Sequence, residues 1–407
     1  MGVASSSARS AAKSSRSSGH ATLTAGVLHA FTGQNAFFGT NAEDACKAAA
    51  RVIDNSGGIM GSKLNCTPYD TKGDPADAVP VTRRMLTSAS NLVMVVGPDG
   101  NDIPSVLPLV VQAKVPEMNT VGDPRYDKQK SPYFWRLTPS DSTMGPALAW
   151  YVAHRKLMSI ADLFTSDLSA QTTVNPFRNA YRRLQGKLVL SQTIAPDQSS
   201  YQTEVAALAG AKVQALVGEM DPQTASTYLT ELQQQKGSLF PFISTQVATQ
   251  PGWLPAVVQA IGAANTVKYL TVVAPNMTGT KAALAQYVTN LKKVGGSSYQ
   301  LNNTIVAATY DGVISFALAM DMAHSTKPST YVSYIRKVTT AGKGVKVVHS
   351  YAAGAAALKA GKKIDYVGAA GAMNFNSYNT SARPYAVYKY SQAKQGLVEQ
   401  SVLPSAA

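Results

Sequence analysis

From Leu23 onward the sequence alternates between short apolar segments typical of strands and longer segments with helical periodicity. The first helix is expected to begin at Asn41 and to end at Gly57 and Gly58, because asparagine is a good N-cap and glycine a good C-terminal residue. Strands that alternate with helices favour an α/β fold with parallel sheets covered on both faces. The expected strands are 22–31, 61–70, 92–96, 115–119, 159–164, 188–194, 214–218, 241–245 and 269–275.

The segments that follow these strands are rich in Gly, Asp, Ser, Thr, Asn and Gln, with Phe37 and Phe38 as an apolar pair. In open parallel sheets, ligands bind outside the carboxyl ends of the strands. Small polar groups beside one or two aromatic rings are typical of a site for a small polar molecule. Helix capping also enriches strand-to-helix loops in Ser, Asp and Thr. Composition alone leaves both interpretations open.

The chain has 407 residues, of which 45% are hydrophobic, and this is enough for two domains with cores of their own. Its formal net charge is +14, but Lys and Arg are spread along the chain, without an arginine-rich helix or zinc-finger spacing. We therefore expect no nucleic-acid partner. The sequence has no run of 18 or more apolar residues, so we expect no segment that spans a membrane.

The beginning of the chain has a different composition. Residues 4–21 are almost entirely Ser, Ala, Arg and Lys, and no apolar stretch typical of a signal peptide follows Met1. Such a composition cannot bury a core, so residues 1–20 are expected to form a disordered tail. A tether between a membrane anchor and a folded domain fits this tail, and so does a mis-assigned start or a cloning remnant.

The chain has two cysteines, Cys46 and Cys66. Two cysteines alone, on a predicted helix and on the strand that follows it, favour one disulfide in an oxidising compartment. Two buried free thiols are the alternative. No C-x-x-C motif is present, so neither a redox motif nor a zinc site is indicated.

No motif for catalysis is complete. The chain lacks phosphate-binding, dinucleotide-binding and nucleophile-elbow motifs, and its five histidines lack metal-ligand spacing. His29 ends the first expected strand and could face the site, although a structural histidine is the favoured interpretation. Asp74 before Pro75 fits a helix N-cap followed by proline at the first helical position better than a catalytic acid. We therefore expect no catalytic residues, no cofactor and no metal; a hydrolase using Asp70 or Asp123 is the alternative.

Several weak motifs nevertheless occur in a specific order along residues 23–397. They are FTGQNAFFG, IDNSGGIMGSKL, YDTKGDPADAV, VVGP, VPEMNTVGDP, FWRLTPSD, SSYQTEVAALAGAKVQALV, ATYDGVISFALAM and YVGAAGAMNFN. In this order the chain resembles the periplasmic solute-binding proteins of the branched-chain-amino-acid type, which bind Leu, Ile or Val. Proteins of this family are extracellular receptors that deliver solutes to ABC importers.

The resemblance implies the type I periplasmic-binding fold, an α/β fold of two Rossmann-like lobes with parallel central sheets joined by three hinge crossings. Lobe one is expected over residues 21–138 plus 275–364, and lobe two over 139–274 plus 365–407. The ligand is expected between the lobes, where hinge closure encloses it. The turn at 69–79 is then a structural connection beside the cleft.

The resemblance also implies a set of ligand-binding positions. They are Phe37, Phe38, Gly100, Asn101, Val121, Gly122, Asp123, Leu168, Met220 and Gln246.

This set departs from the family pattern. Gly100 or Asn101, and Asp123, replace the hydroxyl side chains that grip a ligand carboxylate, and Gln246 replaces the acid that pairs with a ligand ammonium. A buried, unpaired ammonium is costly. Either Glu219 or Asp221 supplies the charge after a shift of the alignment, or the ligand is a more apolar, aromatic or amide-bearing solute.

The resemblance implies a non-enzymatic substrate-binding protein of an ABC importer. The solute is expected to be an amino acid, an amide, or an aromatic or carboxylate compound. The expected partners are this solute and the importer permease, and we expect a monomer. The protein is expected outside the cytoplasm, either periplasmic or tethered to the membrane through its N-terminal region. A ligand-sensing module of the same fold that signals to a partner protein is the alternative.

Overall fold

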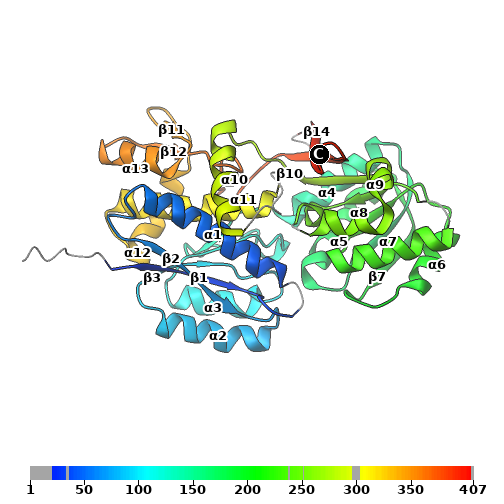
Figure 1. Ribbon diagram of the computed structural model, residues 1–407, viewed down its shortest axis with the longest axis horizontal. Coiled ribbons are helices and arrows are strands. Elements are labelled where there is room, and N and C mark those ends of the chain that lie inside the picture. Colours follow the sequence, from blue (N-terminus) through cyan, green and yellow to red (C-terminus); the bar gives the residue numbers. More distant parts are fainter. Residues whose placement is uncertain (1–20, 34–35, 237–238, 251, 296–302, 405–407) are drawn as a thin grey trace, which may run out of the picture.

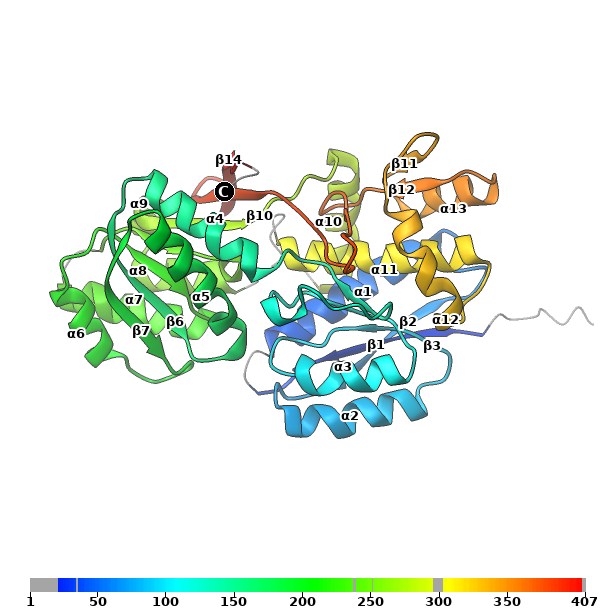
Figure 2. The same ribbon diagram turned by 180° about the vertical axis from the view of Figure 1, so that it is seen from behind.

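The computed structural model describes residues 21–33, 36–236, 239–250, 252–295 and 303–404, so the expected tail at 1–20 lies outside the described residues. The described chain forms two α/β bodies that lie side by side (Figure 1 and, from behind, Figure 2). Each body contains one large sheet with helices on both of its faces.

The first body is built on a five-stranded parallel sheet in the order β2-β1-β3-β4-β5. Helices α1 and α11 pack on one face of this sheet, and α2 and α3 cover the other face (Figure 1). Its elements are β1 (Leu23–His29), α1 (Phe37–Asn55), β2 (Leu64–Asp70), α2 (Pro75–Ser88), β3 (Leu92–Val96), α3 (Ile103–Gln112), β4 (Glu117–Asn119), β5 (Phe134–Arg136), α10 (Lys281–Gly295), α11 (Thr304–Ala323), α12 (Pro328–Tyr331), β11 (Lys346–Val348), α13 (Tyr351–Lys359) and β12 (Ile364–Tyr366).

The second body has a seven-stranded sheet in the order β14-β13-β10-β9-β8-β6-β7. Its central strands are parallel, while β13 and β14 form an antiparallel edge. Helices α4 and α5 share one apolar core with the sheet, and α6, α7 and α8 share the other. Its elements are α4 (Asp141–His154), β6 (Ser159–Thr165), α5 (Leu168–Arg183), β7 (Lys187–Ile194), α6 (Gln202–Gly210), β8 (Leu216–Glu219), α7 (Pro222–Lys236), β9 (Phe242–Ser244), α8 (Trp253–Ile261), α9 (Ala263–Tyr269), β10 (Leu270–Pro275), β13 (Tyr385–Ser391) and β14 (Gly396–Val402).

The described chain passes between the two bodies after β5, after β10 and after β12 (Figure 2). The described chain therefore forms two lobes, each with its own sheet and its own apolar core. The lobe boundaries at residues 138, 274 and 364 stay predictions. The core of the first body also includes Ala369, Ala370, Met373 and Phe375, which lie beyond the last of these boundaries.

All nine expected strands are present, with ends that differ by a few residues. The first helix begins at Phe37, so the prediction that Asn41 caps it is wrong. Asn41 lies one turn inside α1, where its side chain contacts the other body. The cap predicted at Asp74 is confirmed, because its carboxylate accepts a hydrogen bond from the N–H of Ala76 over 2.8 Å, with Pro75 as the first helical residue.

The predicted disulfide is confirmed between Cys46 on α1 and Cys66 on β2. The two Cα atoms are 6.0 Å apart, and both side chains are buried between the helix and the sheet. The bond therefore ties the first helix to the strand at the edge of the first sheet, across a sequence separation of 20 residues.

Helix α11 is long and apolar enough to cross a membrane, but 83% of its most apolar window is buried inside the protein. It carries Asp311 into the core of the first body. The carboxylate accepts hydrogen bonds from the N–H groups of Ala369 and Ala370, at 3.0 and 2.7 Å, and from the hydroxyl of Tyr366 at 2.9 Å. A single buried acid thus holds the start of the third passage between the bodies.

We predict that reduction of the disulfide lowers the free energy of unfolding by about 3 kcal/mol, because a closed loop of this length restricts the unfolded chain. Urea unfolding of the oxidised and reduced protein measures this difference. Thiol titration of the denatured, unreduced protein is the control and should detect no free thiol. Two titratable thiols would contradict the disulfide.

We predict that Asp311→Ala lowers the free energy of unfolding by about 3 kcal/mol, because it leaves two buried N–H groups and Arg383 without their acceptor or counter-charge. The matched control is Glu399→Ala, which removes an exposed carboxylate from β14. Urea unfolding compares both variants with the unchanged chain. An equal, small effect of the two substitutions would show that the Asp311 contacts contribute little.

Candidate functional site

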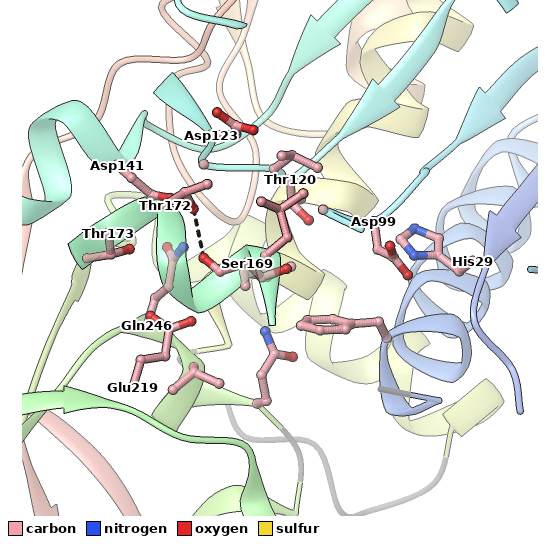
Figure 3. A pocket seen from close by; sticks show the side chains of 18 residues that line it. His29, Asp99, Thr120, Asp123, Asp141, Ser169, Thr172, Thr173, Glu219 and Gln246 are labelled. Atoms are coloured by element: carbon pink, nitrogen blue, oxygen red, sulfur yellow. Dashed lines mark hydrogen bonds between the residues drawn. The ribbon is translucent and has the colours of Figure 1, made fainter. Parts of the chain in front are cut away.

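One cavity lies between the two bodies, with a volume of about 70 Å³. In the first body, the ends of β1, β3 and β4 and the first turns of α1 and α11 line it. In the second body, α4 and α5 begin beside it, and the ends of β8 and β9 complete the wall (Figure 3). The lining residues are His29, Phe38, Asp99, Gly100, Thr120, Val121, Gly122, Asp123, Asp141, Leu168, Ser169, Thr172, Thr173, Glu219, Gln246, Val247, Gln250 and Ile305.

The topology explains why these residues meet. Strands β1, β3 and β4 are parallel neighbours, so their carboxyl ends lie at one edge of the first sheet. Strands β8 and β9 are likewise parallel neighbours in the second sheet. The two edges face one another across the junction, and each strand presents its following loop to the same space (Figure 3).

The cavity is lined by four carboxyl side chains, Asp99, Asp123, Asp141 and Glu219. None of the described residues that line it is Lys or Arg. The one lining side chain that titrates as a base is His29, and burial lowers its pKa to about 4, so the imidazole is neutral at pH 7. No cationic side chain therefore lines this part of the described structure.

Asp123 differs from the other three acids because it has a cationic partner. Its carboxylate lies 2.6–2.8 Å from the backbone N, Nε and Nη2 atoms of Arg125, which follows it by two residues. This pairing turns the Asp123 carboxylate toward its own loop. Its charge is consequently balanced outside the cavity.

Asp99 begins the turn after β3 and is buried. One carboxylate oxygen accepts the N–H groups of Asn101 and Asp102, at 3.0 and 3.2 Å. The other oxygen, Oδ2, is buried without a hydrogen-bond partner in the described structure. Burial raises the pKa of Asp99, and the nearby Asp167 raises it further.

Asp141 and Glu219 lie on the wall formed by the second body. Each carboxylate accepts one hydroxyl hydrogen bond over 2.6 Å, from Thr172 to Asp141 and from Thr245 to Glu219. Burial raises the pKa of Glu219 to about 8 and that of Asp141 to about 6. Burial is the main cause for Glu219, and the neighbouring Asp141 and Asp167 raise its pKa further, so Glu219 is mostly protonated at pH 7.

The two bodies touch around the cavity. The Nδ2 group of Asn41 donates to Oε1 of Gln250 over 3.0 Å, which joins α1 to the second body. Gly122 lies so close to Asp141 that an added Cβ would stand 2.2 Å from Oδ1 of that carboxylate. The absence of a side chain at Gly122 thus permits the observed approach of the two walls.

Seven of the ten residues expected from the sequence line the cavity; they are Phe38, Gly100, Val121, Gly122, Asp123, Leu168 and Gln246. Phe37, Asn101 and Met220 do not line it. The Phe37 ring lies tilted against the Phe38 ring, with centroids 4.3 Å apart. The N–H of Asn101 donates a hydrogen bond to the Asp99 carboxylate in the turn after β3. Met220 is fully buried in the core of the second body. Ligand binding by any of the ten stays a prediction.

Sequence reasoning missed most of the acidic and hydroxyl groups of the cavity. His29, for which a structural role is the favoured interpretation and a site position the alternative, lines the cavity, and so does Glu219, which the sequence offers only as an alternative to Gln246. The strand-end position of Asp99 and Thr120 was the available signal, because both follow expected strands. The residues Asp141, Ser169, Thr172 and Thr173 lie on α4 and α5, where the sequence gives no sign that these helix faces meet the first body.

The described residues contain no group of three or more His, Cys, Asp or Glu side chains that could hold a metal.

We predict that the stability of the empty protein falls between pH 5 and pH 8, partly because of Glu219. Its pKa is raised to about 8 from the model-peptide value of 4.5, so the folded state binds more protons than the unfolded state over this window. The Glu219 contribution is present at low pH and is lost as the pH rises, by about 1 kcal/mol per unit. Glu219→Gln should flatten the pH profile of urea unfolding, and the exposed-site control Glu399→Gln should not. Equal slopes in the two variants would contradict the burial of the Glu219 charge.

Solved structures with this architecture are similar along nearly the whole chain. A branched-chain amino acid transporter substrate-binding protein, LivJ, from Streptococcus pneumoniae in complex with isoleucine has a TM-score of 0.75 at 18% identity, over 94% of this chain and 99% of that one. A solute-binding protein of an ABC transporter from R. palustris, in complex with benzoate, has a TM-score of 0.73 at 13% identity, over 94% and 96%. A fatty acid ABC transporter substrate-binding protein from Thermomonospora curvata has a TM-score of 0.72 at 16% identity, over 94% and 92%.

No curated protein sequence matches the chain. The profile of the family described as periplasmic binding protein, however, matches residues 22–395. This range begins before β1 and ends between β13 and β14, so it includes every segment that lines the cavity. The chain therefore belongs to the periplasmic binding protein family and has its type I, two-lobed fold.

Proposed function

We propose that this protein is the substrate-binding component of an ABC importer and that it captures a small organic solute between its two lobes. The observation that carries the proposal is a cavity to which both lobes contribute strand ends and helix N-termini. A solute in this position contacts both lobes only when they are closed. Such contacts stabilise the closed state over the open one, and this difference is what solute capture requires.

The solved relatives support the proposal without identifying the solute. Proteins of this architecture have been seen with isoleucine and with benzoate, and another is described as a fatty acid transporter component. These ligands differ in charge, size and polarity. The shared fold therefore does not identify the solute, which depends on the side chains that line each cavity.

We further propose that the protein does not catalyse a reaction. The cavity brings together Ser169, His29 and Asp99, which are the residue types of a nucleophile, a base and an acid. In the described structure, no hydrogen bond joins Ser169 to His29, and the Nδ1 atom of His29 has no partner. Nucleophilic catalysis needs such a bond between nucleophile and base. A role in binding accounts for these polar groups.

The remaining features of the proposal follow from this role. An importer permease is the protein partner, and the protein works outside the cytoplasm, where the Cys46–Cys66 disulfide persists. We propose that it works as a monomer, because one chain supplies both walls of the cavity. We also propose that the N-terminal region tethers the protein to the membrane.

The test is a thermal-shift screen of the whole chain with amines, amino acids, amides and aromatic carboxylates. A solute at 100 times its Kd adds about 2.7 kcal/mol to the free energy of unfolding and raises the melting temperature by about 2 °C or more. Small-angle scattering of the same samples should show a smaller radius of gyration when solute is bound. If no compound raises the melting temperature, the proposed function fails.

We predict that Gly122→Ala weakens binding of any compound found in this screen by at least about tenfold. The new methyl group displaces the Asp141 carboxylate, whose nearest atom would be 2.2 Å away, and breaks its 2.6 Å hydrogen bond from Thr172. The matched control is Gly210→Ala on α6, where an added Cβ meets no atom within 4 Å. Isothermal titration of both variants measures the effect. Unchanged affinity in Gly122→Ala would place the binding site elsewhere.

A further inference from the structure

Acidic side chains line the cavity, whereas no Lys or Arg of the described structure does so. Asp99 and His29 belong to the wall of the first lobe, and Asp141 and Glu219 belong to the wall of the second, so acids line the cavity from both sides (Figure 3). Asp123 is balanced by Arg125, but no Lys or Arg among the described residues that line the cavity pairs with the other three carboxyl groups, and burial lowers the pKa of His29 to about 4, so its ring is neutral at pH 7. The solute has to complement this arrangement.

Among the described residues, no group donates a hydrogen bond to the Oδ2 atom of Asp99. The Asp99 side chain is buried, with 9% of its surface exposed. A buried carboxylate oxygen is normally satisfied, because burial without a partner is costly. A donor from the solute would supply the absent bond.

Charged groups from the neighbouring elements reinforce the negative character of the cavity. Besides burial, Asp167 before α5 raises the pKa of Asp99, and Asp99 in turn raises that of Asp102 at the start of α3. Besides burial, Asp141 and Asp167 raise the pKa of Glu219. Arg136 is the cation that acts on Asp141. Its guanidinium, however, already lies 2.6 Å from the Asp127 carboxylate and 2.9 Å from the Asp123 carbonyl oxygen.

Such a cavity disfavours a carboxylate and favours a cation. A carboxylate-bearing solute would add a negative charge beside three acids that no lining Lys or Arg of the described structure balances, and like charges at short range repel strongly in a low-dielectric site. An ammonium group carries a positive charge and only donates hydrogen bonds, which matches acceptor-only carboxylates. A neutral amide can satisfy hydrogen bonds but leaves the charge uncompensated.

The size of the cavity sets a second limit. Its volume of about 70 Å³ corresponds to about five to seven water positions of 10–15 Å³ each. A cavity of this volume suits a compact solute.

On the basis of the proposed function, we infer that the solute is a small organic amine, bound as its ammonium cation among Asp99, Asp141 and Glu219, and that it carries no carboxylate.

Titration calorimetry of the whole chain at pH 7 tests this inference with five probes: propylamine, 1,4-diaminobutane, valine, propionamide and benzoate. At least one amine should bind, and valine, propionamide and benzoate should bind at least 100-fold more weakly. Amine binding should also release close to one proton, because Glu219, with a pKa of about 8, has to ionise to pair with the cation. Titrations in two buffers with different ionisation enthalpies measure that proton.

Two substitutions assign the charge to named residues. Glu219→Gln should weaken amine binding at least tenfold and abolish proton release, while Asp99→Asn should weaken binding at least tenfold. The matched control is Glu399→Gln, which removes an exposed acid from β14 and should change neither quantity. Melting temperatures of the solute-free variants show whether each remains folded. If Glu219→Gln fails to fold, Asp99→Asn and the proton release of the unchanged chain still decide the matter.

The outcomes separate the inference from the function on which it rests. Preferred binding of valine, propionamide or benzoate overturns the amine and leaves the solute-binding function standing. Amine binding without proton release, or with full affinity in both variants, also overturns the inference, because the named acids would not carry the charge. If none of the probes and none of the screened compounds binds, the proposed function itself fails.

Discussion

Carboxyl groups enclosed without a counter-charge at the junction of the two lobes are the constraint on which this structure depends. Burying an ionised acid is so costly that the group holds its proton instead. Burial accordingly raises the pKa of Glu219 to about 8 and that of Asp141 to about 6. The charge preference inferred for the cavity follows from this cost.

Contacts elsewhere in the fold position the elements that form the walls of the cavity. In the first lobe, the disulfide joins α1 to β2, and the neighbouring strand β1 presents His29 to the cavity. Asp311 fixes the chain where it leaves β12 for the second lobe, and Gly368 lies so close that an added Cβ would stand 2.0 Å from its carboxylate. These contacts join α1 to the first sheet and the start of the third passage to α11.

The order of strands and helices and the edge at which a ligand binds could be predicted from the sequence, because hydrophobic periodicity is local and parallel strands end at one edge. Contacts between the lobes could not be predicted. Asn41 looked like a helix cap but contacts Gln250, which is 209 residues away. Met220 was assigned to the site and is buried in the second lobe, whereas its neighbour Glu219 lines the cavity. A one-residue error at the end of a strand reverses which side chain faces the ligand, and the sequence does not define strand ends that closely.

On the proposed function, the same acids couple solute binding to closure. In an open cleft their carboxylates are hydrated, so their pKa values lie near ordinary values and closure without solute requires uptake of protons. A cation removes that requirement, because it pairs with the acids as water leaves. The free energy that favours closure is therefore the difference between pairing the charge in the closed cavity and hydrating it in the open cleft. A neutral or anionic solute of the same size fills the same space but leaves the acids to be protonated. Selection by charge and closure of the lobes are then two consequences of one interaction.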